Sequence, residues 1–175
     1  MKGSIPRLSW LLFFFWSTWL FAVTGWLASG PLGAFAPDLG LVLLMSLERK
    51  HPGHRAFVAA TLVAAARIAL STDAPLAILA GYLGVAGGVG LLRRAVELDR
   101  SVSRGILTAL LALALSFWWR SARWVVLASD GIELQTPAPE WRGAVATGLV
   151  TLIGARLFLR LPGLSPFARG ERRHA

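Results

Sequence analysis

The chain contains no cysteine among its 175 residues, which excludes disulfides, thiolate nucleophiles and metal sites with cysteine ligands. Charge is also scarce, since only 15% of the residues are charged, against about 25% in an ordinary soluble domain. Hydrophobic residues make up 55% of the chain, and the mean hydropathy is +0.61. The apolar residues occur in continuous runs and not in amphipathic stripes. Helices formed by such runs are apolar on all sides and belong in lipid or deep inside a larger protein. We therefore predict an all-α, polytopic membrane protein with one domain.

Six apolar segments approach the roughly 20 residues that a helix needs to cross a hydrocarbon core about 30 Å thick. We place the six transmembrane helices at about 8–28, 32–47, 56–71, 75–92, 105–128 and 143–159, in one compact bundle, followed by a short basic cytoplasmic tail at 160–175. The first segment is too long for the apolar part of a cleaved signal peptide. Its tryptophans Trp10 and Trp26 lie near its two ends, where they suit the membrane interfaces. We interpret it as a retained span.

The net charge of +9 follows membrane topology and does not indicate nucleic-acid binding, because the basic residues lie at the ends of the apolar runs and the aromatic residues lie inside them. With the N-terminus in the cytoplasm, the predicted cytoplasmic segments carry 13 basic residues and the opposite loops carry only Arg142. This bias is the positive-inside pattern. It predicts a multi-pass protein of the bacterial cytoplasmic membrane with both termini cytoplasmic. The 13 residues are Lys2, Arg7, Arg49, Lys50, Arg55, Arg93, Arg94, Arg100, Arg104, Arg160, Arg169, Arg172 and Arg173.

Four arginines fall inside the predicted spans, where each needs a partner or a route to the interface. Arg156 lies close enough to the cytoplasmic end to reach it. Arg120 and Arg123 share one helical face, and we expect interfacial anchoring against lipid phosphates or Asp130 and Glu133. The alternative is a bound anionic ligand or a carboxylate of a partner protein. Arg67 either extends toward the nearby Thr72-Asp73 turn or faces a partner.

Two further features of the spans are interface candidates. Ala80, Gly84 and Gly88 recur every four residues in the fourth span and predict a smooth strip for close helix approach. Internal packing is the preferred reading of this strip, and an interface with another protein is the alternative. Pro37 and Asp38 open the second span, where proline suits the first helical turn and an acidic residue favours the helix dipole.

Signatures of catalysis are missing. The sequence has no His-Glu-x-x-His motif and no serine in a nucleophile-elbow context. His51 and His54 flank Pro52-Gly53 without a third ligand, which makes a poor metal site. We expect no enzymatic activity, no metal and no cofactor.

The arrangement resembles MreD, the small membrane subunit of the bacterial rod-shape, or elongation, machinery. The similarity begins at APDLGLVLLMSLERKHPG, which contains the Pro-Asp pair and a short aliphatic span. It continues through AATLVAAARIALSTDAPLAILAGYLGVAGGVGLLRR, with a small-residue turn, the Gly81-Tyr82 pair and a basic loop. The resemblance covers about residues 32–118. Many members of that family place an acidic residue near the end of the third span, where this chain has Arg67.

The resemblance implies a non-enzymatic scaffold for peptidoglycan synthesis, with six helices and a fold similar to the substrate-binding subunits of energy-coupling-factor vitamin transporters. It implies an MreC-like protein, the actin-like MreB, and a RodA-type glycosyltransferase with its transpeptidase as partners. Two alternatives stay open. One is a transporter subunit that binds a small molecule between its helices, with Arg67, Thr61, Thr108, Ser116 and Tyr82 as its interior polar groups. The other is a lipid-handling protein that holds a phosphate headgroup with Arg120 and Arg123.

Overall fold

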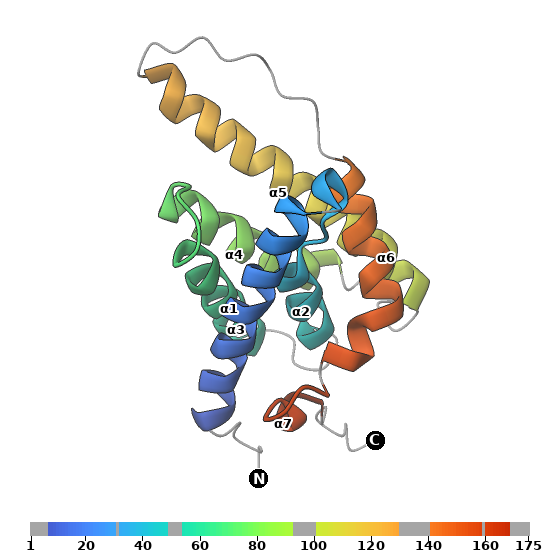
Figure 1. Cartoon of the computed structure of the whole chain (residues 1–175). Coiled ribbons are helices and arrows are strands. Elements are labelled where there is room, and N and C mark those ends of the chain that lie inside the picture. The colour runs from blue at the N-terminus through green and yellow to red at the C-terminus, as the bar shows by residue number, and fades with distance from the viewer. Residues whose placement is uncertain are drawn as a thin grey trace.

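The structure is a computed structural model that describes residues 7–30, 32–48, 54–92, 101–129, 141–158 and 160–168. Its regular elements within these ranges are all helical, which confirms the all-α prediction. They are α1 (Arg7–Ser29), a 3-10 helix η1 (Gly33–Phe35), α2 (Leu39–Glu48), α3 (His54–Ile68), α4 (Pro75–Leu92), α5 (Ser101–Ser129), α6 (Trp141–Phe158) and α7 (Ser165–Ala168) (Figure 1).

Three of the described helices are long and apolar enough to cross a membrane, namely α1, α4 and residues 102–125 of α5. The second predicted span, 32–47, is not one continuous helix. Ala36 adopts an extended conformation, as expected of a residue that precedes proline, and α2 begins only at Leu39. Its 10 residues cover about 15 Å, roughly half of a hydrocarbon core. The helix in this segment is therefore shorter than the predicted range, and it begins after Asp38.

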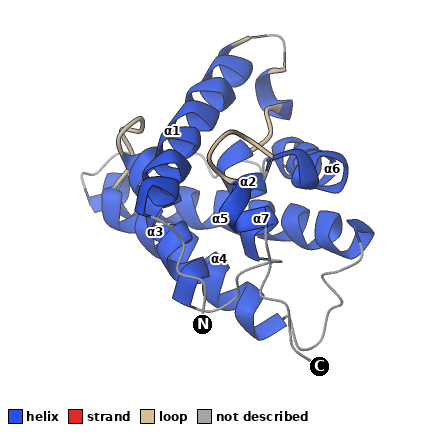
Figure 2. Ribbon diagram, turned by 90° about the horizontal axis from the view of Figure 1, so that it is seen from below, coloured by secondary structure: helices blue, strands red, loops and turns tan. Residues whose placement is uncertain are grey.

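Helix α2 forms the centre of the protein. Its side chains from Leu41 to Leu47 are buried around its whole circumference, with at most 2% of any residue exposed. It packs against α1, α3, α5 and α6, and both views show it between α1 and α6 (Figures 1 and 2). A helix that is apolar on every side is stable in such a position because its neighbours cover all of its faces.

The two described ends of the chain lie close together. The ring of Phe167 in α7 is 4.8 Å from that of Trp10 in α1, and the Trp16 indole donates a hydrogen bond to the Pro162 carbonyl at 3.1 Å. Leu164 and Phe167 are fully buried. The predicted tail 160–175 thus contains a packed helical turn at 165–168, and its remaining residues 169–175 lie outside the described ranges.

Glycine brings α5 and α6 together. A Cβ atom at position 148 would lie 2.8 Å from both the Ala109 Cβ atom and the Gly105 carbonyl oxygen, so the two backbones touch at this crossing. In contrast, the predicted strip of Ala80, Gly84 and Gly88 faces outward. A Cβ atom at Gly84 or Gly88 would meet no atom within 4 Å, and Ala80 is exposed. The preferred reading of the strip as an internal packing surface is wrong.

Candidate functional site

Asp38 lies at the break between η1 and α2, in the interior of the protein. Its carbonyl oxygen accepts a hydrogen bond from the Val42 amide at 3.1 Å, and its side-chain Oδ1 accepts one from the Leu41 amide at 2.8 Å. This geometry is that of an N-cap residue, which satisfies amides that have no partner in the first helical turn. The predicted helix-opening role of Asp38 is confirmed, whereas Pro37 precedes the helix and is not in its first turn.

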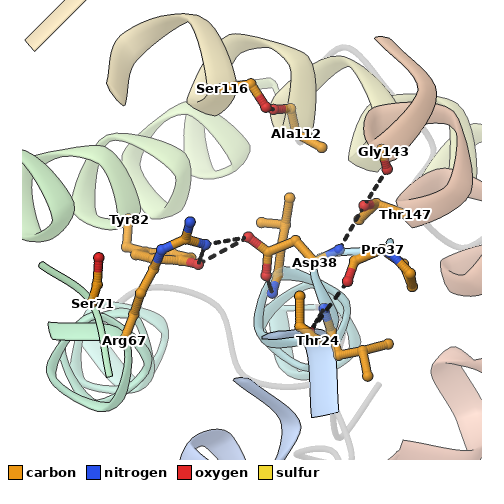
Figure 3. A network of polar contacts seen from close by, with 12 residues as sticks. Thr24, Pro37, Asp38, Arg67, Ser71, Tyr82, Ala112, Ser116, Gly143 and Thr147 are labelled. Carbon is orange, nitrogen blue, oxygen red and sulfur yellow. Dashed lines mark hydrogen bonds and ion pairs between the residues drawn. The ribbon is translucent and has the colours of Figure 1, made fainter. Parts of the chain in front are cut away.

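The second carboxylate oxygen of Asp38 is the acceptor of an interior ion pair. Its Oδ2 atom is 3.0 Å from Nη1 of Arg67 in α3 and accepts a hydrogen bond from the Tyr82 hydroxyl of α4 at 3.1 Å. Arg67 Nη1 also donates to the Tyr82 hydroxyl oxygen at 3.3 Å. The charge of Arg67 is therefore balanced inside the protein, where its side chain points toward Asp38 and Tyr82 (Figure 3).

Aromatic rings surround the guanidinium of Arg67. Its Cζ atom lies 3.7 Å from the centroid of a Trp119 ring in α5 and 5.6 Å from that of Phe21 in α1. Such cation–π contacts stabilise a cation by about 0.5–2 kcal/mol, most where water is excluded. The Tyr82 and Trp119 rings are 5.8 Å apart, so the rings and the ion pair form one continuous contact group.

Two threonines connect this group to the remaining helices. Thr147 of α6 accepts a hydrogen bond from the Asp38 amide at 2.9 Å, and its own hydroxyl donates to the Gly143 carbonyl at 2.7 Å. Thr24 of α1 lies within hydrogen-bond distance of the Pro37 carbonyl, at 3.2 Å, and of the Leu39 amide, at 3.4 Å. Hydrogen bonds and the ion pair thus join α1, α2, α3, α4 and α6 around Asp38 (Figure 3), and α5 contributes the Trp119 ring.

A cavity of about 590 Å³ borders the network. This volume falls in the range of small-molecule pockets in proteins, roughly 300–1,000 Å³. The cavity walls include Arg67, Arg120 and Arg123, two carboxylates, Asp38 and Asp73, and three hydroxyl groups, Thr24, Ser116 and Thr147. Small apolar residues and Trp119 complete the lining. The cavity is therefore lined both by charged and hydroxyl groups and by small apolar residues.

The site brings together most of the charged residues that the sequence singled out. Pro37, Asp38 and Arg67 belong to the central network, and Arg120 and Arg123 line the cavity beside it. The outward strip of α4 lies elsewhere. Thr61 is exposed and Thr108 is bonded to its own helix, so neither belongs to the cavity as the transporter reading expected. Arg104, assigned to a loop, is buried in the first turn of α5 with 3% exposure.

Several predicted features lie outside the described residues. These are His51, most of the basic cytoplasmic residues, the side chain of Arg156, and the carboxylates of Asp130 and Glu133 that were offered as partners for Arg120 and Arg123.

Sequence reasoning missed Thr24, Thr147 and Trp119 as parts of the site. A single threonine in an apolar helix usually bonds to the carbonyl four residues earlier, so its presence alone does not mark a site. The available signal was Pro37, because a proline inside an apolar segment leaves backbone groups that polar side chains from neighbouring helices must satisfy.

The polar groups around the cavity can hold an anion or a polar molecule. Among the described residues no three histidine, aspartate or glutamate side chains gather as metal ligands. The Ser116 hydroxyl donates to the carbonyl of Ala112 in its own helix at 2.9 Å. Comparison of the chain with protein-family models, with curated proteins and with solved structures found no match.

Proposed function

We propose that this chain is an integral protein of the bacterial cytoplasmic membrane with six membrane-spanning segments and both ends in the cytoplasm. The three long apolar helices support a membrane location. Large apolar side chains that point outward also support it, such as Leu76 at 81%, Ile153 at 75% and Phe117 at 71% exposed. Such side chains are stable against lipid, whereas an apolar surface this extensive in water would promote aggregation. The contact of α7 with the start of α1 is consistent with termini on one side.

Within that membrane, we infer that the chain acts as a non-enzymatic, MreD-like scaffold subunit of the cell-wall elongation machinery. One observation carries this proposal: two motifs on which the resemblance rests, the Pro-Asp pair and the Gly-Tyr pair, meet in space, together with Arg67, where the chain departs from the family. Asp38 of the Pro-Asp pair, Tyr82 of the Gly-Tyr pair and Arg67 are 15 to 44 positions apart in sequence and bind one another directly. Short motifs that meet at one point of a fold are more informative than the same motifs read separately.

Under this proposal, the difference from the MreD family at Arg67 has a physical explanation. This chain has a positive charge at Arg67 and a negative one at Asp38, 3.0 Å apart. The positive charge at Arg67 is therefore accompanied by its counter-charge within this chain.

The outward strip on α4 offers a surface for a partner helix. Ala80, Gly84 and Gly88 leave a smooth face, and small residues at this spacing allow helix backbones to approach closely in a membrane. The strip supports the scaffold proposal because none of the described residues packs against it at Gly84 or Gly88.

The test is purification of the full chain from its native membranes in mild detergent, followed by identification of co-purifying proteins and small molecules by mass spectrometry. The scaffold proposal expects an MreC-like protein or a glycosyltransferase–transpeptidase pair at constant stoichiometry. The matched variant is Gly84→Leu, which changes the outward surface of α4 and leaves the interior unchanged. If its amount of purified chain is normal and the partner is missing, the loss is one of partner binding and not of folding. Recovery of the chain without any cell-wall partner would contradict the proposal.

A second function is favoured by one observation, the polar cavity of about 590 Å³. A cavity of this size between helices suits a membrane subunit that binds a small substrate for a transporter. Co-purification with an ATPase module and a stoichiometric small molecule would replace the scaffold proposal with this one.

A further inference from the structure

Residues of four helices surround the guanidinium of Arg67, which belongs to a fifth helix, α3. Phe21 of α1 and Trp119 of α5 provide aromatic rings, whose centroids lie 5.6 Å and 3.7 Å from the Arg67 Cζ atom. Asp38, at the start of α2, provides a carboxylate at 3.0 Å, and Tyr82 of α4 provides a hydroxyl oxygen at 3.3 Å. We call these four residues the cation cage. Aromatic faces attract organic cations, and a carboxylate adds a charge-assisted hydrogen bond.

The members of the cation cage are held in place by contacts that do not involve Arg67. The Asp38 carboxylate accepts a hydrogen bond from a backbone amide in the first turn of α2 at 2.8 Å and another from the Tyr82 hydroxyl at 3.1 Å. Tyr82 is fully buried, and its ring lies 6.2 Å from that of Phe21 and 5.8 Å from that of Trp119. These contacts remain when the Arg67 side chain is removed, so the cage is preformed.

The tryptophan of the cage is also positioned by α4. The indole of the preceding residue, Trp118, donates a hydrogen bond to the Ala77 carbonyl at 2.8 Å. A Cβ atom at Gly81 would lie 3.2 Å from Cδ1 of Trp118 and 3.2 Å from Nε1 of Trp119. Both indoles therefore pack closely against α4, and this packing holds the Trp119 ring beside the cage without any contribution from Arg67.

The cation cage borders the cavity, because Asp38, Arg67 and Trp119 all belong to the cavity lining. A solute in the cavity therefore reaches the carboxylate and the ring that Arg67 uses. Removal of the Arg67 side chain would take away the cation that balances Asp38, and a carboxylate left in this way in the interior favours a replacement cation. A guanidinium suits the place because it is planar, lies flat on aromatic faces and still offers N–H donors to a carboxylate.

We propose that the inner wall of the cavity is a binding site for a planar organic cation of the guanidinium or amidinium class, and that Arg67 is its resident occupant. In the original chain Arg67 fills the site, so residue 67 determines which charge the inner wall presents to a solute. Without the Arg67 side chain, the same cage accepts a free guanidinium compound from the cavity. The site depends on the contacts around Asp38, and it stands whether or not the chain is a scaffold.

The experiment uses the full chain with Arg67→Ala, purified in a neutral detergent, and ethylguanidinium as the probe. This ion has the same non-hydrogen atoms as the part of an arginine side chain that alanine lacks. The control compounds are N-ethylurea, which has nearly the same shape without the charge, and tetramethylammonium, a cation without N–H donors. Arg160→Ala is the matched control variant, because Arg160 is exposed and lies after the end of α6, whereas the cavity borders the first two turns of α6.

Binding is measured by calorimetry and by the midpoint of unfolding in mixed micelles as the fraction of SDS rises. We expect ethylguanidinium to bind Arg67→Ala saturably and to recover about half or more of the midpoint shift that the substitution causes, since a ligand that binds only the folded state stabilises it. The original chain and Arg160→Ala should not respond, because Arg67 occupies the cage in both.

Two double variants test the walls of the cage. Asp38→Asn added to Arg67→Ala should weaken ethylguanidinium binding about tenfold or more, because a charge-assisted hydrogen bond is lost. Trp119→Leu added to Arg67→Ala should weaken it about threefold or more, because the closest aromatic face is lost.

The proposal is overturned if Arg67→Ala does not bind ethylguanidinium, if N-ethylurea or tetramethylammonium binds equally well, or if Arg160→Ala responds as strongly. If Arg67→Ala does not fold by itself, refolding from SDS in the presence of each compound decides, with the folded fraction measured by far-UV circular dichroism. Recovery of folded chain with ethylguanidinium but not with N-ethylurea supports the site, and failure with both compounds overturns it.

Discussion

Replacement of Asp38 by asparagine separates the two roles of this side chain, which caps α2 and forms an ion pair with Arg67. Asparagine caps a helix about as well as aspartate does, so the contact with the Leu41 amide is preserved. The variant removes the negative charge that faces Arg67 at 3.0 Å. Asp38→Ala removes both the charge and the cap, so the difference between the two variants measures the cap, which we expect to contribute about 1 kcal/mol.

The magnitude of the charge effect follows from burial. Removal of one partner from a fully buried ion pair costs about 3–5 kcal/mol, because the other charge is left without compensation. The side chains of Arg67 and Asp38 retain 23% and 16% exposure toward the cavity. We therefore expect a smaller loss from Asp38→Asn, about 2–3 kcal/mol of unfolding free energy.

The assay is reversible unfolding of the purified chain in mixed micelles as the fraction of SDS rises, followed by far-UV circular dichroism. Arg67→Met and the double variant Asp38→Asn/Arg67→Met complete a double-mutant cycle. The double variant should be more stable than the sum of the single losses predicts, by about 1–2 kcal/mol, because no unpaired charge remains in it. Asp73→Asn is the control, since Asp73 bonds to Ser71 within its own turn. Additive losses, or equal losses from Asp38→Asn and Asp73→Asn, would refute an interior ion pair.

Three further substitutions test the packing and the outward surface. Gly148→Ala should destabilise the chain by about 1–3 kcal/mol in the same unfolding assay, because the new Cβ atom would press on Ala109 and on the Gly105 carbonyl. The control Gly90→Ala has no neighbour within 4 Å and should be neutral or stabilising by up to about 1 kcal/mol. Equal effects of the two variants would contradict the close α5–α6 crossing. Tyr82→Phe should cost about 1–2 kcal/mol, since it removes the hydrogen bonds that the hydroxyl makes with Asp38 and Arg67 and leaves the ion pair. An unchanged unfolding curve would show that the hydroxyl does not contribute. Gly84→Leu should leave unfolding unchanged and reduce recovery of any partner that binds α4, while Gly25→Leu, at an equally open position of α1, should reduce neither; a loss of stability in Gly84→Leu would contradict the outward placement.

The helices were predictable from the sequence because an apolar run of sufficient length has few alternatives to a helix. The range 75–92 predicted for the fourth segment is the range of α4 in the structure, and α1 covers the first predicted segment with one extra residue at each end. The break before α2 was less accessible. Pro37 is compatible with a helix start or with an interruption, and the packing of α2 against four other helices favours the shorter helix.

The direction in which a residue faces was the weakest part of the prediction. Ala80, Gly84 and Gly88 form a valid strip, but spacing alone does not state whether a strip faces the protein or its surroundings. Gly148 had no comparable repeat and nevertheless forms the close crossing, because contact with α5 depends on where two distant segments meet. The partner of Arg67 was missed for the same reason, since Asp38 is 29 positions away in sequence.

The polar centre of the protein follows step by step from Pro37. Because proline and the extended residue before it interrupt the second apolar segment, α2 begins inside the protein and its first amides need acceptors there. Asp38 supplies an acceptor but also introduces a charge, which is costly in a region with little water. Arg67 balances that charge, and the rings of Trp119 and Phe21 accommodate its guanidinium. The ion pair is thus explained by the helix break alone and requires no ligand.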